Sequence, residues 1–241
     1  MKIFNREKTS KVYGVDRWKE IRVGLDEKYN SSDEWKEAVD IFSRRIRRYY
    51  LNPINKLKDG ITGEGFVIVT AQCALIETFA AFKEGKVYDR NKKESEIYYN
   101  NSRNLFVKFL TTESIFEGVF FNNNQTNCPH NAEQFYSKVR CGLMHEARTK
   151  DEWIIHQDEE NYSKKRPKYK KTGKFIKENN QHKKIIFRNQ LQYALEEYFE
   201  QYKSKLKKSD EKYNKLRRLF ARKLDDLYDI PEDRNLEWWN N

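Results

Sequence analysis

The chain has 241 residues, of which 37% are hydrophobic, enough to bury the core of one large domain. Its 48 basic and 37 acidic residues give a net charge of +11, which favours a polyanionic partner, either nucleic acid or an anionic membrane surface. Only 9 glycines and 4 prolines argue against a turn-rich β-sandwich and favour a mainly α-helical protein. No apolar run reaches the roughly 20 residues of a spanning helix, and the N-terminal residues lack a signal peptide's apolar stretch. We therefore expect a cytoplasmic protein with no membrane partner.

The three cysteines, Cys73, Cys128 and Cys141, are an odd set without the spacing of a disulfide framework. We therefore expect reduced thiols, with Cys73 buried in an apolar helix. Cys128, His130, Cys141 and His145 also offer four zinc ligands in a short span, but without the Cys-x(2–4)-Cys spacing of common structural sites. We predict no metal and no cofactor, and keep zinc as an alternative that would occupy His145.

A first helix is predicted after Ser31, because Ser31 and Glu34 have the spacing of a capping box. Pro53 is expected to lie just beyond its end. Apolar residues recur at helical spacing and define the buried face: Trp35, Ala38, Phe42, Ile46 and Tyr49. The other face carries four arginines, which are either simply exposed or contact a nucleic-acid backbone: Arg44, Arg45, Arg47 and Arg48.

The segment 64–83 is apolar almost all round, which predicts a central, buried helix that ends at Gly85. Gln72 and Glu77 are its polar exceptions. Both would need partners if they are buried, because an unpaired polar group is costly to remove from water.

Next along the chain come a helix predicted over residues 102–110 and a loop predicted over residues 117–130, where asparagines and a proline gather. A further helix should start at about Asn131. Its buried face is expected to comprise Phe135, Val139, Leu143 and Ala147.

The pattern changes after Arg148. Residues 153–155 and 184–187 are short β-type runs, which we interpret as a small β-hairpin insertion over about residues 150–188. Between them lies a basic excursion with interleaved tyrosines, typical of a loop that grips phosphates and stacks on bases, although a solvated charge run is the alternative. The candidate RNA-binding residues are Lys164, Lys165, Arg166, Lys168, Lys170 and Lys171.

From residue 189 to residue 228 the chain returns to helical spacing, with a break at Ser209-Asp210. No internal repeat or Gly/Ser linker interrupts it, so we predict a single domain over residues 1–241. That domain would consist of core helices at about 31–147, the basic hairpin excursion at 150–188 and C-terminal helices at 189–228.

The most informative string contains Arg140 and His145, five positions apart near the end of the helix from Asn131. On an ideal helix the two side chains project about 140° apart, so a single helix cannot close a site around both. A symmetric second copy can bring another Arg/His pair opposite the first.

The two residue types suit RNA cleavage without a metal. When the 2′-hydroxyl of RNA attacks the neighbouring phosphate, a group must move protons near neutral pH, as histidine does. A fixed cation must also stabilise the charge developing on phosphorus, and guanidinium offers planar, permanently charged donors. We therefore assign His145 as the acid or base and Arg140 as the phosphate clamp. The expected products are a 2′,3′-cyclic phosphate and a 5′-hydroxyl.

Residues 139–147, VRCGLMHEA, resemble the R-x(4–6)-H motif of the HEPN superfamily. The resemblance implies an all-α bundle, a homodimer with its paired motifs at the interface, and metal-independent endoribonuclease activity. It also implies a toxin or effector of prokaryotic antiviral defence, with RNA as the substrate and a cognate antitoxin or defence-system protein as a candidate partner. Arg140 and His145 are the two residues carried over from the motif.

One position departs from that motif. The residue after the arginine is usually polar in active members, whereas here it is Cys141, a poor hydrogen-bond donor. The alternative is therefore a catalytically silent HEPN-like module that binds nucleic acid or a partner protein. In a third interpretation the spacing is accidental. Arg140 then forms a structural ion pair, with Glu77 as the candidate partner, and His145 hydrogen-bonds the last carbonyls of its helix.

Overall fold

The computed structural model describes residues 14–30, 32–121, 130–158 and 175–240, and it is mainly helical, as predicted. Interleaved parts of the chain build two compact units. We call them the terminal unit, which comprises residues 1–47, 81–100 and 201–241, and the central unit, which comprises residues 48–80 and 101–200.

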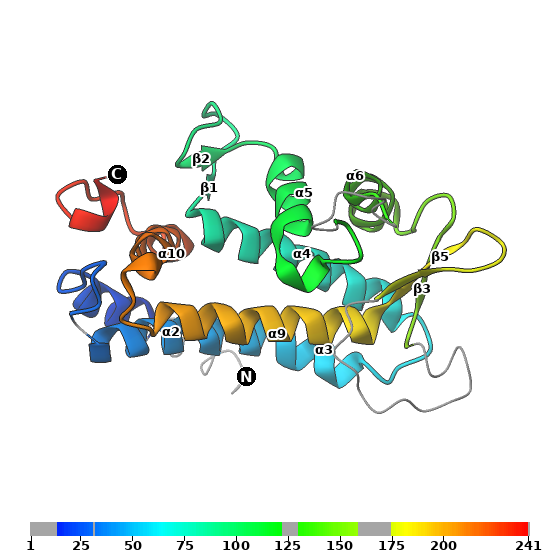
Figure 1. The fold of residues 1–241 in the computed structure, drawn as a ribbon, viewed down its shortest axis with the longest axis horizontal. Coiled ribbons are helices and arrows are strands. Elements are labelled where there is room, and N and C mark those ends of the chain that lie inside the picture. Colours follow the sequence, from blue (N-terminus) through cyan, green and yellow to red (C-terminus); the bar gives the residue numbers. More distant parts are fainter. Residues whose placement is uncertain (1–13, 31, 122–129, 159–174, 241) are drawn as a thin grey trace, which may run out of the picture. The chain divides into compact units, whose positions relative to one another are not determined.

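Helices dominate both units, and a few short strands accompany them. The terminal unit holds α2 (Ser32–Ile46), β1 (Val87–Tyr88), β2 (Tyr98–Tyr99), η4 (Glu211–Tyr213), α10 (Asn214–Leu227) and η5 (Glu237–Trp239). The central unit holds α3 (Asn52–Leu57), α5 (Ser102–Thr112), η2 (Ser114–Phe116), α6 (Ala132–Gln134), η3 (Phe135–Arg140), α7 (Cys141–Glu146), β3 (Trp153–His156), β4 (Ile176–Glu178) and β5 (Lys184–Phe187). Three elements give residues to both units: η1 (Arg47–Leu51), α4 (Glu64–Glu84) and α9 (Arg188–Leu206). Figure 1 labels the two long ones, α4 and α9.

The core of the terminal unit is a cluster of aromatic rings. Phe42 of α2 and Phe220 of α10 meet edge to face with ring centroids 5.5 Å apart. Phe82 packs on Phe42 at 4.2 Å, and the Tyr202 hydroxyl donates to the Phe82 carbonyl at 3.2 Å. These rings bury large apolar areas and pack in specific geometries. The apolar residues of α2 recur at helical spacing because one face of the helix packs into this cluster.

A buried carboxylate joins the first and last described segments of the terminal unit. Asp225 of α10 is fully buried and accepts hydrogen bonds from three side chains. Arg22 donates twice, at 2.8 and 2.5 Å, while the indoles of Trp18 and Trp239 donate at 2.7 and 3.2 Å. Burial raises the pKa of Asp225, although Arg22 and the two indoles oppose that shift.

Gly85 ends α4, as predicted. Its φ of +60° is left-handed, and the N–H of Lys86 donates to the Ala81 carbonyl at 3.0 Å, which caps the helix. A Cβ at Gly85 would lie 2.7 Å from the side chain of Leu219, so both the conformation and the space require glycine.

The arginine-rich end of α2 departs from the predicted helix. After Ile46 the chain continues as the π-helix η1 and then as α3, with Pro53 in the first turn of α3. Proline lacks the N–H that an α-helix would use at that position, which accounts for the widened turn. The turn shifts the helical phase, so Tyr49 is 41% exposed and Leu51 is buried instead. The predictions of a helix end before Pro53 and of a buried Tyr49 are therefore wrong.

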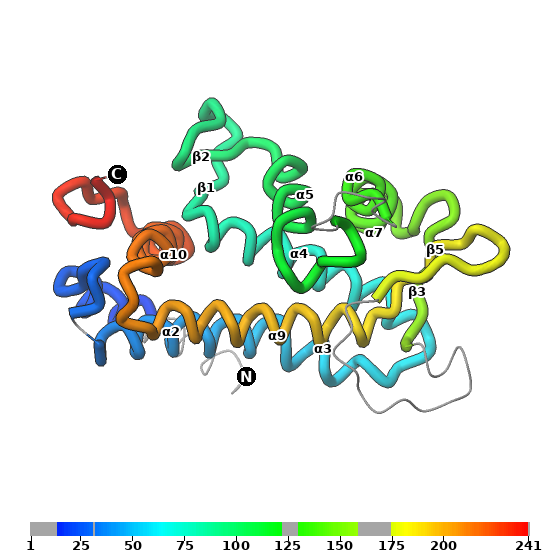
Figure 2. Tube along the Cα trace, in the orientation of Figure 1, coloured from blue at the N-terminus to red at the C-terminus, as the bar shows by residue number. Residues whose placement is uncertain are grey.

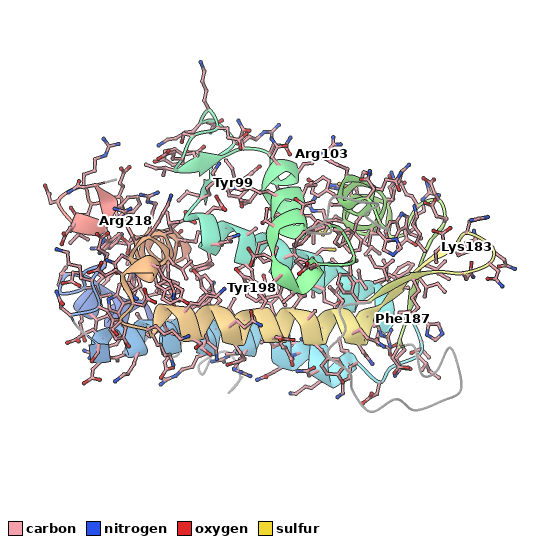
Figure 3. The ribbon with its side chains drawn as sticks, in the orientation of Figure 1. Tyr99, Arg103, Lys183, Phe187, Tyr198 and Arg218 are labelled. Atoms are coloured by element: carbon pink, nitrogen blue, oxygen red, sulfur yellow. The ribbon has the colours of Figure 1, made fainter. Side chains whose placement is uncertain are left out.

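Helices α4, α5 and α9 meet in the core of the central unit around Tyr198, which is labelled in Figure 3. The Tyr198 ring lies 5.3 Å from Phe79 of α4 and 4.9 Å from Phe109 of α5. Gln72 of α4 is fully buried and donates to the Arg188 carbonyl at 2.7 Å. The amide nitrogen of this polar exception therefore has a partner, whereas its buried Oε1 has none among the described residues.

Helix α4 is long and apolar enough to cross a membrane by length and composition alone, and it is the one such helix among the described residues. The expectation that no segment reaches that length is therefore wrong. Most of its apolar window is buried inside the structure. Core helices of folded domains share this combination of length, apolar composition and burial.

The two predicted β-type runs form strands β3 and β5, but these strands pair in parallel. The hairpin is made instead by β4 and β5, which are antiparallel, with Ile176 opposite Ile186. Figure 2 shows the reversal between them in yellow. Because β4 turns the chain back before β5 begins, β5 runs in the same direction as β3, and the sheet order is β3-β5-β4. The predicted hairpin between the first and last runs is therefore wrong.

Candidate active site

The helix predicted from Asn131 is present as three consecutive pieces, α6, η3 and α7, which we call the motif helix. The Asn131 side chain caps it by accepting the backbone N–H of Gln134 at 3.1 Å. The piece η3 is π-helical, because the N–H of Cys141 donates to the carbonyl of Tyr136, five residues earlier. π-Helical turns are rare in proteins overall, but those that occur are often found at functional sites. This one ends at Arg140.

The motif helix is held by its apolar face. Phe135, Val139 and Leu143 are buried, as predicted, and the Phe135 ring lies 5.3 Å from Phe120 and 5.6 Å from Trp153. Ala147 was predicted on the same face, but it is exposed. It ends the helix in a left-handed conformation with φ of +53°, so it cannot continue the helical face.

The chain after the motif helix folds back along it. The N–H of Arg148 donates to the Gly142 carbonyl at 3.3 Å, and the N–H of Lys150 donates to the Lys138 carbonyl at 3.0 Å. A Cβ at Gly142 would overlap the carbonyl oxygen of Arg148. Glycine normally weakens a helix interior, and here it allows the returning chain to approach.

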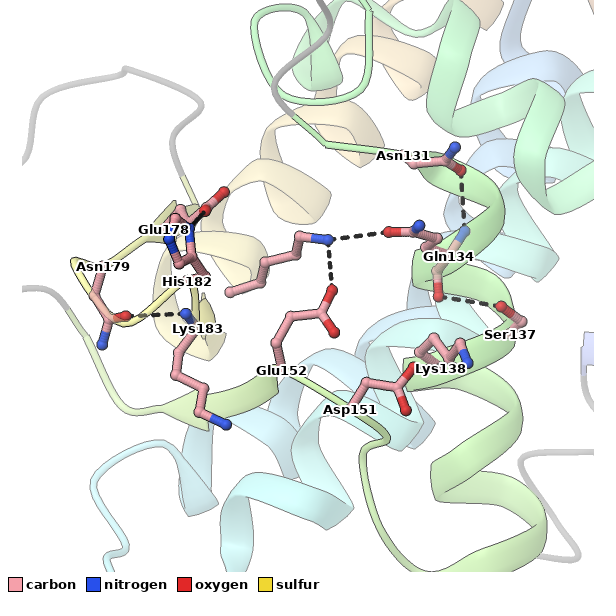
Figure 4. A network of polar contacts seen from close by, with 11 residues as sticks. Asn131, Gln134, Ser137, Lys138, Asp151, Glu152, Glu178, Asn179, His182 and Lys183 are labelled. Atoms are coloured by element: carbon pink, nitrogen blue, oxygen red, sulfur yellow. Dashed lines mark hydrogen bonds and ion pairs between the residues drawn. The ribbon is translucent and has the colours of Figure 1, made fainter.

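Figure 4 shows the polar contacts that join the motif helix to the sheet. Lys184 of β5 donates to Glu152 at 2.6 Å and to Gln134 of α6 at 3.0 Å. Lys138 pairs with Asp151 at 2.7 Å. These contacts, which the sequence did not reveal, fix one side of the motif helix.

Arg140 reaches from the motif helix to α4, where its Nη2 lies 3.0 Å from Glu77 Oε2. The predicted Glu77 partner is therefore confirmed. The Arg140 side chain is 17% exposed and that of Glu77 is 22% exposed. Burial lowers the pKa of the Arg140 guanidinium, but the Glu77 carboxylate and Tyr136 more than offset this, so the pKa is raised overall and the group stays a cation.

Tyr136 lies beneath the Arg140 guanidinium, which is centred 5.3 Å from the ring centroid. Its hydroxyl is 2.9 Å from the hydroxyl of Ser102, the first residue of α5. Burial raises the pKa of the Tyr136 hydroxyl, so the phenol stays protonated at neutral pH. The sequence analysis did not single out Tyr136, although its position four residues before Arg140 is a signal that it shares a helix face with it.

Two cysteines lie in the same region, and neither forms a disulfide. Cys73 of α4 is buried, as predicted, and burial raises the pKa of its thiol to about 12. Cys141 is half-buried beside Arg140. Cys128 lies outside the described residues.

His145 is exposed near the end of α7. Within the described residues its imidazole makes no hydrogen bond or ion pair, so the alternative of a histidine bonded to the last helix carbonyls is not what the structure has. The structure also does not join His145 to Arg140. Arg140 is directed at α4, while His145 remains open to solvent, in keeping with their angular separation of about 140° on a helix.

The other histidines have separate surroundings. His130 is buried beside Trp153, at 6.4 Å between ring centroids, and burial lowers the pKa of its imidazole. His156 lies 3.0 Å from the Asp158 carbonyl, and His182 lies 2.9 Å from Glu178. The described residues contain no group of three or more His, Cys, Asp or Glu side chains able to hold a metal ion.

Basic charge is unevenly distributed along the chain. The described part of the central unit carries 13 basic and 14 acidic side chains, whereas residues 159–174 carry seven basic and two acidic ones. The described part of the central unit, in which the motif helix lies, is therefore nearly neutral. The six predicted RNA-binding residues belong to the basic run and lie outside the described residues: Lys164, Lys165, Arg166, Lys168, Lys170 and Lys171.

Comparison with protein-family models, with curated proteins and with solved structures found no match to this chain.

Proposed function

We propose that this chain is a HEPN-type, metal-independent endoribonuclease that cleaves RNA by attack of the 2′-hydroxyl on the adjacent phosphate. One observation supports the proposal most. Among the described residues, the half-buried cation Arg140 has a single hydrogen bond to a side chain, and the exposed His145, five residues later, has none. The motif resemblance and the excess of basic residues support it independently.

Each residue has one task in this mechanism. A guanidinium has five N–H donors, and Glu77 occupies one of those of Arg140 within the described residues. The others can bind phosphate oxygens and stabilise the charge that develops in the transition state. His145 takes the proton from the 2′-hydroxyl or delivers one to the departing 5′-oxygen.

We further propose that the active form is a homodimer. Arg140 and His145 point in different directions along one helix, so a site containing both groups needs a second copy of the motif helix. Met144, immediately before His145, is 49% exposed and offers an apolar contact for that copy. A role as a toxin or defence effector, with a cognate antitoxin or other defence-system partner, rests on the resemblance alone.

The test is incubation of the full chain with mixed cellular RNA in EDTA, beside His145→Ala and Arg140→Ala. Wild-type cleavage that leaves cyclic-phosphate ends, with at least about a hundredfold loss in each variant, would support the proposal. His182→Asn is the matched control, because this exposed histidine of the β4–β5 turn should not affect cleavage. Equal cleavage by wild type and His145→Ala would show that another group, or a contaminant, is responsible.

The second candidate is a catalytically silent module that binds nucleic acid. The Glu77–Arg140 ion pair favours it, because the carboxylate already neutralises the cation. It predicts RNA binding and dimerisation without cleavage by any variant. Retained cleavage in EDTA by wild type rules it out.

A further inference from the structure

Two groups contact the Arg140 guanidinium and restrict where it can point. Glu77 takes an N–H of Nη2 at 3.0 Å, and the Tyr136 ring lies under the guanidinium at 5.3 Å. The face of an aromatic ring attracts a cation, so the planar group is held over the ring. The remaining Nη1 and Nε donors have no partner within the described residues.

The Tyr136 ring is itself fixed. Its hydroxyl is bonded to Ser102 at 2.9 Å, and its edge meets the Phe106 ring at 5.3 Å between centroids. Ser102 and Phe106 both belong to α5, and Phe106 is fully buried. The Tyr136 ring beneath Arg140 is therefore held by a neighbouring helix, α5, as well as by the motif helix.

We propose that Tyr136 is a positioning residue for Arg140, and that Ser102 fixes Tyr136 through its hydroxyl. This inference rests on the proposed function. An arginine side chain has several rotatable bonds, and its ordering on phosphate costs conformational entropy unless the protein has already restrained it. Tyr136 covers one face of the guanidinium, and Glu77 binds one of its edges. The opposite edge, which carries the remaining donors, is the phosphate-binding edge. The ligand of this edge is a backbone phosphate of RNA.

Cleavage kinetics test the role of the ring. Tyr136→Leu should lower kcat and kcat/KM together by at least about tenfold, because a misplaced transition-state contact affects the chemical step more than binding. Tyr136→Phe keeps the ring and should lose less activity than Tyr136→Leu. Since Arg140 does not titrate near neutral pH, the pH profile should keep its shape in both variants.

The hydrogen bond between Tyr136 and Ser102 of α5 is tested by Ser102→Ala, which should lower cleavage to about the same extent as Tyr136→Phe. Ser137→Ala is the matched control, because Ser137 follows Tyr136 on the motif helix and its hydroxyl donates to the carbonyl of Gln134, on the same helix, at 3.4 Å. Equal effects of Ser102→Ala and Ser137→Ala would overturn the role of Ser102.

A readout independent of cleavage separates this inference from the proposed function. In ¹⁵N-arginine-labelled full chain, the Arg140 Nε–Hε signal, assigned with Arg140→Lys, should be rigid and should shift on addition of a 2′-O-methyl RNA oligonucleotide. Such an oligonucleotide has a phosphate backbone but no free 2′-hydroxyl, so it cannot be cleaved by this route. Tyr136→Leu should make the signal mobile or broaden it and weaken the RNA-induced shift, with thermal unfolding as the control for folding.

The outcomes are distinct. If wild type does not cleave but its Arg140 signal is rigid and responds to RNA only when Tyr136 is present, the ribonuclease proposal fails and the positioning role stands. If Tyr136→Leu leaves the rigidity of Arg140, its response to RNA and any cleavage unchanged, the positioning role is overturned. No response of the wild-type Arg140 signal to RNA would also overturn it.

Discussion

Each unit has an arginine placed against a tyrosine ring, yet the two arginines are used differently. Arg217 of the terminal unit is fully buried, and its guanidinium lies 5.2 Å from the Tyr29 ring. Arg140 of the central unit is half-buried and donates to one acceptor within the described residues. The acceptors around Arg217 are the carbonyls of Glu27, Lys208 and Asp210, at 2.7, 2.5 and 3.3 Å, and the side-chain oxygen of Asn214, at 2.5 Å.

Under the proposed function, this difference separates a structural arginine from a binding one. The donors of Arg217 are distributed over four oxygens of its own unit, so little capacity remains for a ligand. Most donors of Arg140 have no partner among the described residues, while Glu77 and Tyr136 restrain its position. Occupied donors indicate a contribution to stability, and restrained but open donors indicate a binding role.

The largest effect on stability is expected at Arg217. Arg217→Leu removes the donor from four buried or partly buried oxygens, and should lower the free energy of unfolding by about 4 kcal/mol. Urea denaturation followed by circular dichroism measures it. Arg148→Ala, at a 65% exposed arginine, should change stability by less than about 0.5 kcal/mol. A loss below about 1 kcal/mol for Arg217→Leu would contradict the structural role.

A smaller but substantial effect is expected at Asp225. Asp225→Asn keeps the shape but leaves the buried Arg22 without its counter-charge, and should cost about 3 kcal/mol. The neighbouring Asp226→Asn is the control, because Asp226 pairs with Lys223 in a less buried position and should cost at most about 1 kcal/mol. Similar urea midpoints for the two variants would show that the buried network contributes little.

At Arg140 the expected stability effect is smaller again. Arg140→Ala leaves the Glu77 carboxylate, which is 22% exposed, without its cation and should cost about 2 kcal/mol, while cleavage is lost. Arg140→Lys keeps the charge but lacks the planar fork, so it should fold normally and still lose most activity. A loss of stability at Arg140 as large as that at Arg217 would remove the distinction between the two arginines.

The smallest effect is a pH dependence from His130. Burial lowers the pKa of its imidazole below the ordinary 6.5, with Lys184 acting in the same direction and the Ile176 carbonyl and Glu178 opposing it. Protonation therefore favours the unfolded state. The contribution of neutral His130 to stability is complete above about pH 6.5 and declines as the pH falls below that value.

Urea denaturation at several pH values between 5 and 8 measures this contribution for wild type and His130→Gln. The variant should lose stability less steeply on acidification. His182→Asn, at an exposed histidine, is expected to follow wild type. Parallel curves for wild type and His130→Gln would exclude His130 as the source.

Local signals in the sequence were enough for much of the secondary structure. The Asn131 cap, the Gly85 helix end and the helix over residues 102–110 depend on hydrogen bonds and apolar spacing within a few residues, and all three are present. The need of Glu77 for a cation was also evident, since a lone carboxylate in an apolar helix is costly to bury. Its predicted partner, Arg140, is the one observed.

Other features depend on residues far apart in the chain, and only the tertiary structure decided them. The direction of β5 depends on the intervening strand β4, and no property of the two terminal runs reveals that strand's pairing. The π-helical turn η1 shifts which side chains face the core by an amount that apolar spacing does not encode, so that Leu51 is buried and Tyr49 is exposed. The contact between Tyr136 and Ser102 joins residues 34 positions apart. Periodicity describes one helix at a time, whereas packing between helices determines which polar groups meet.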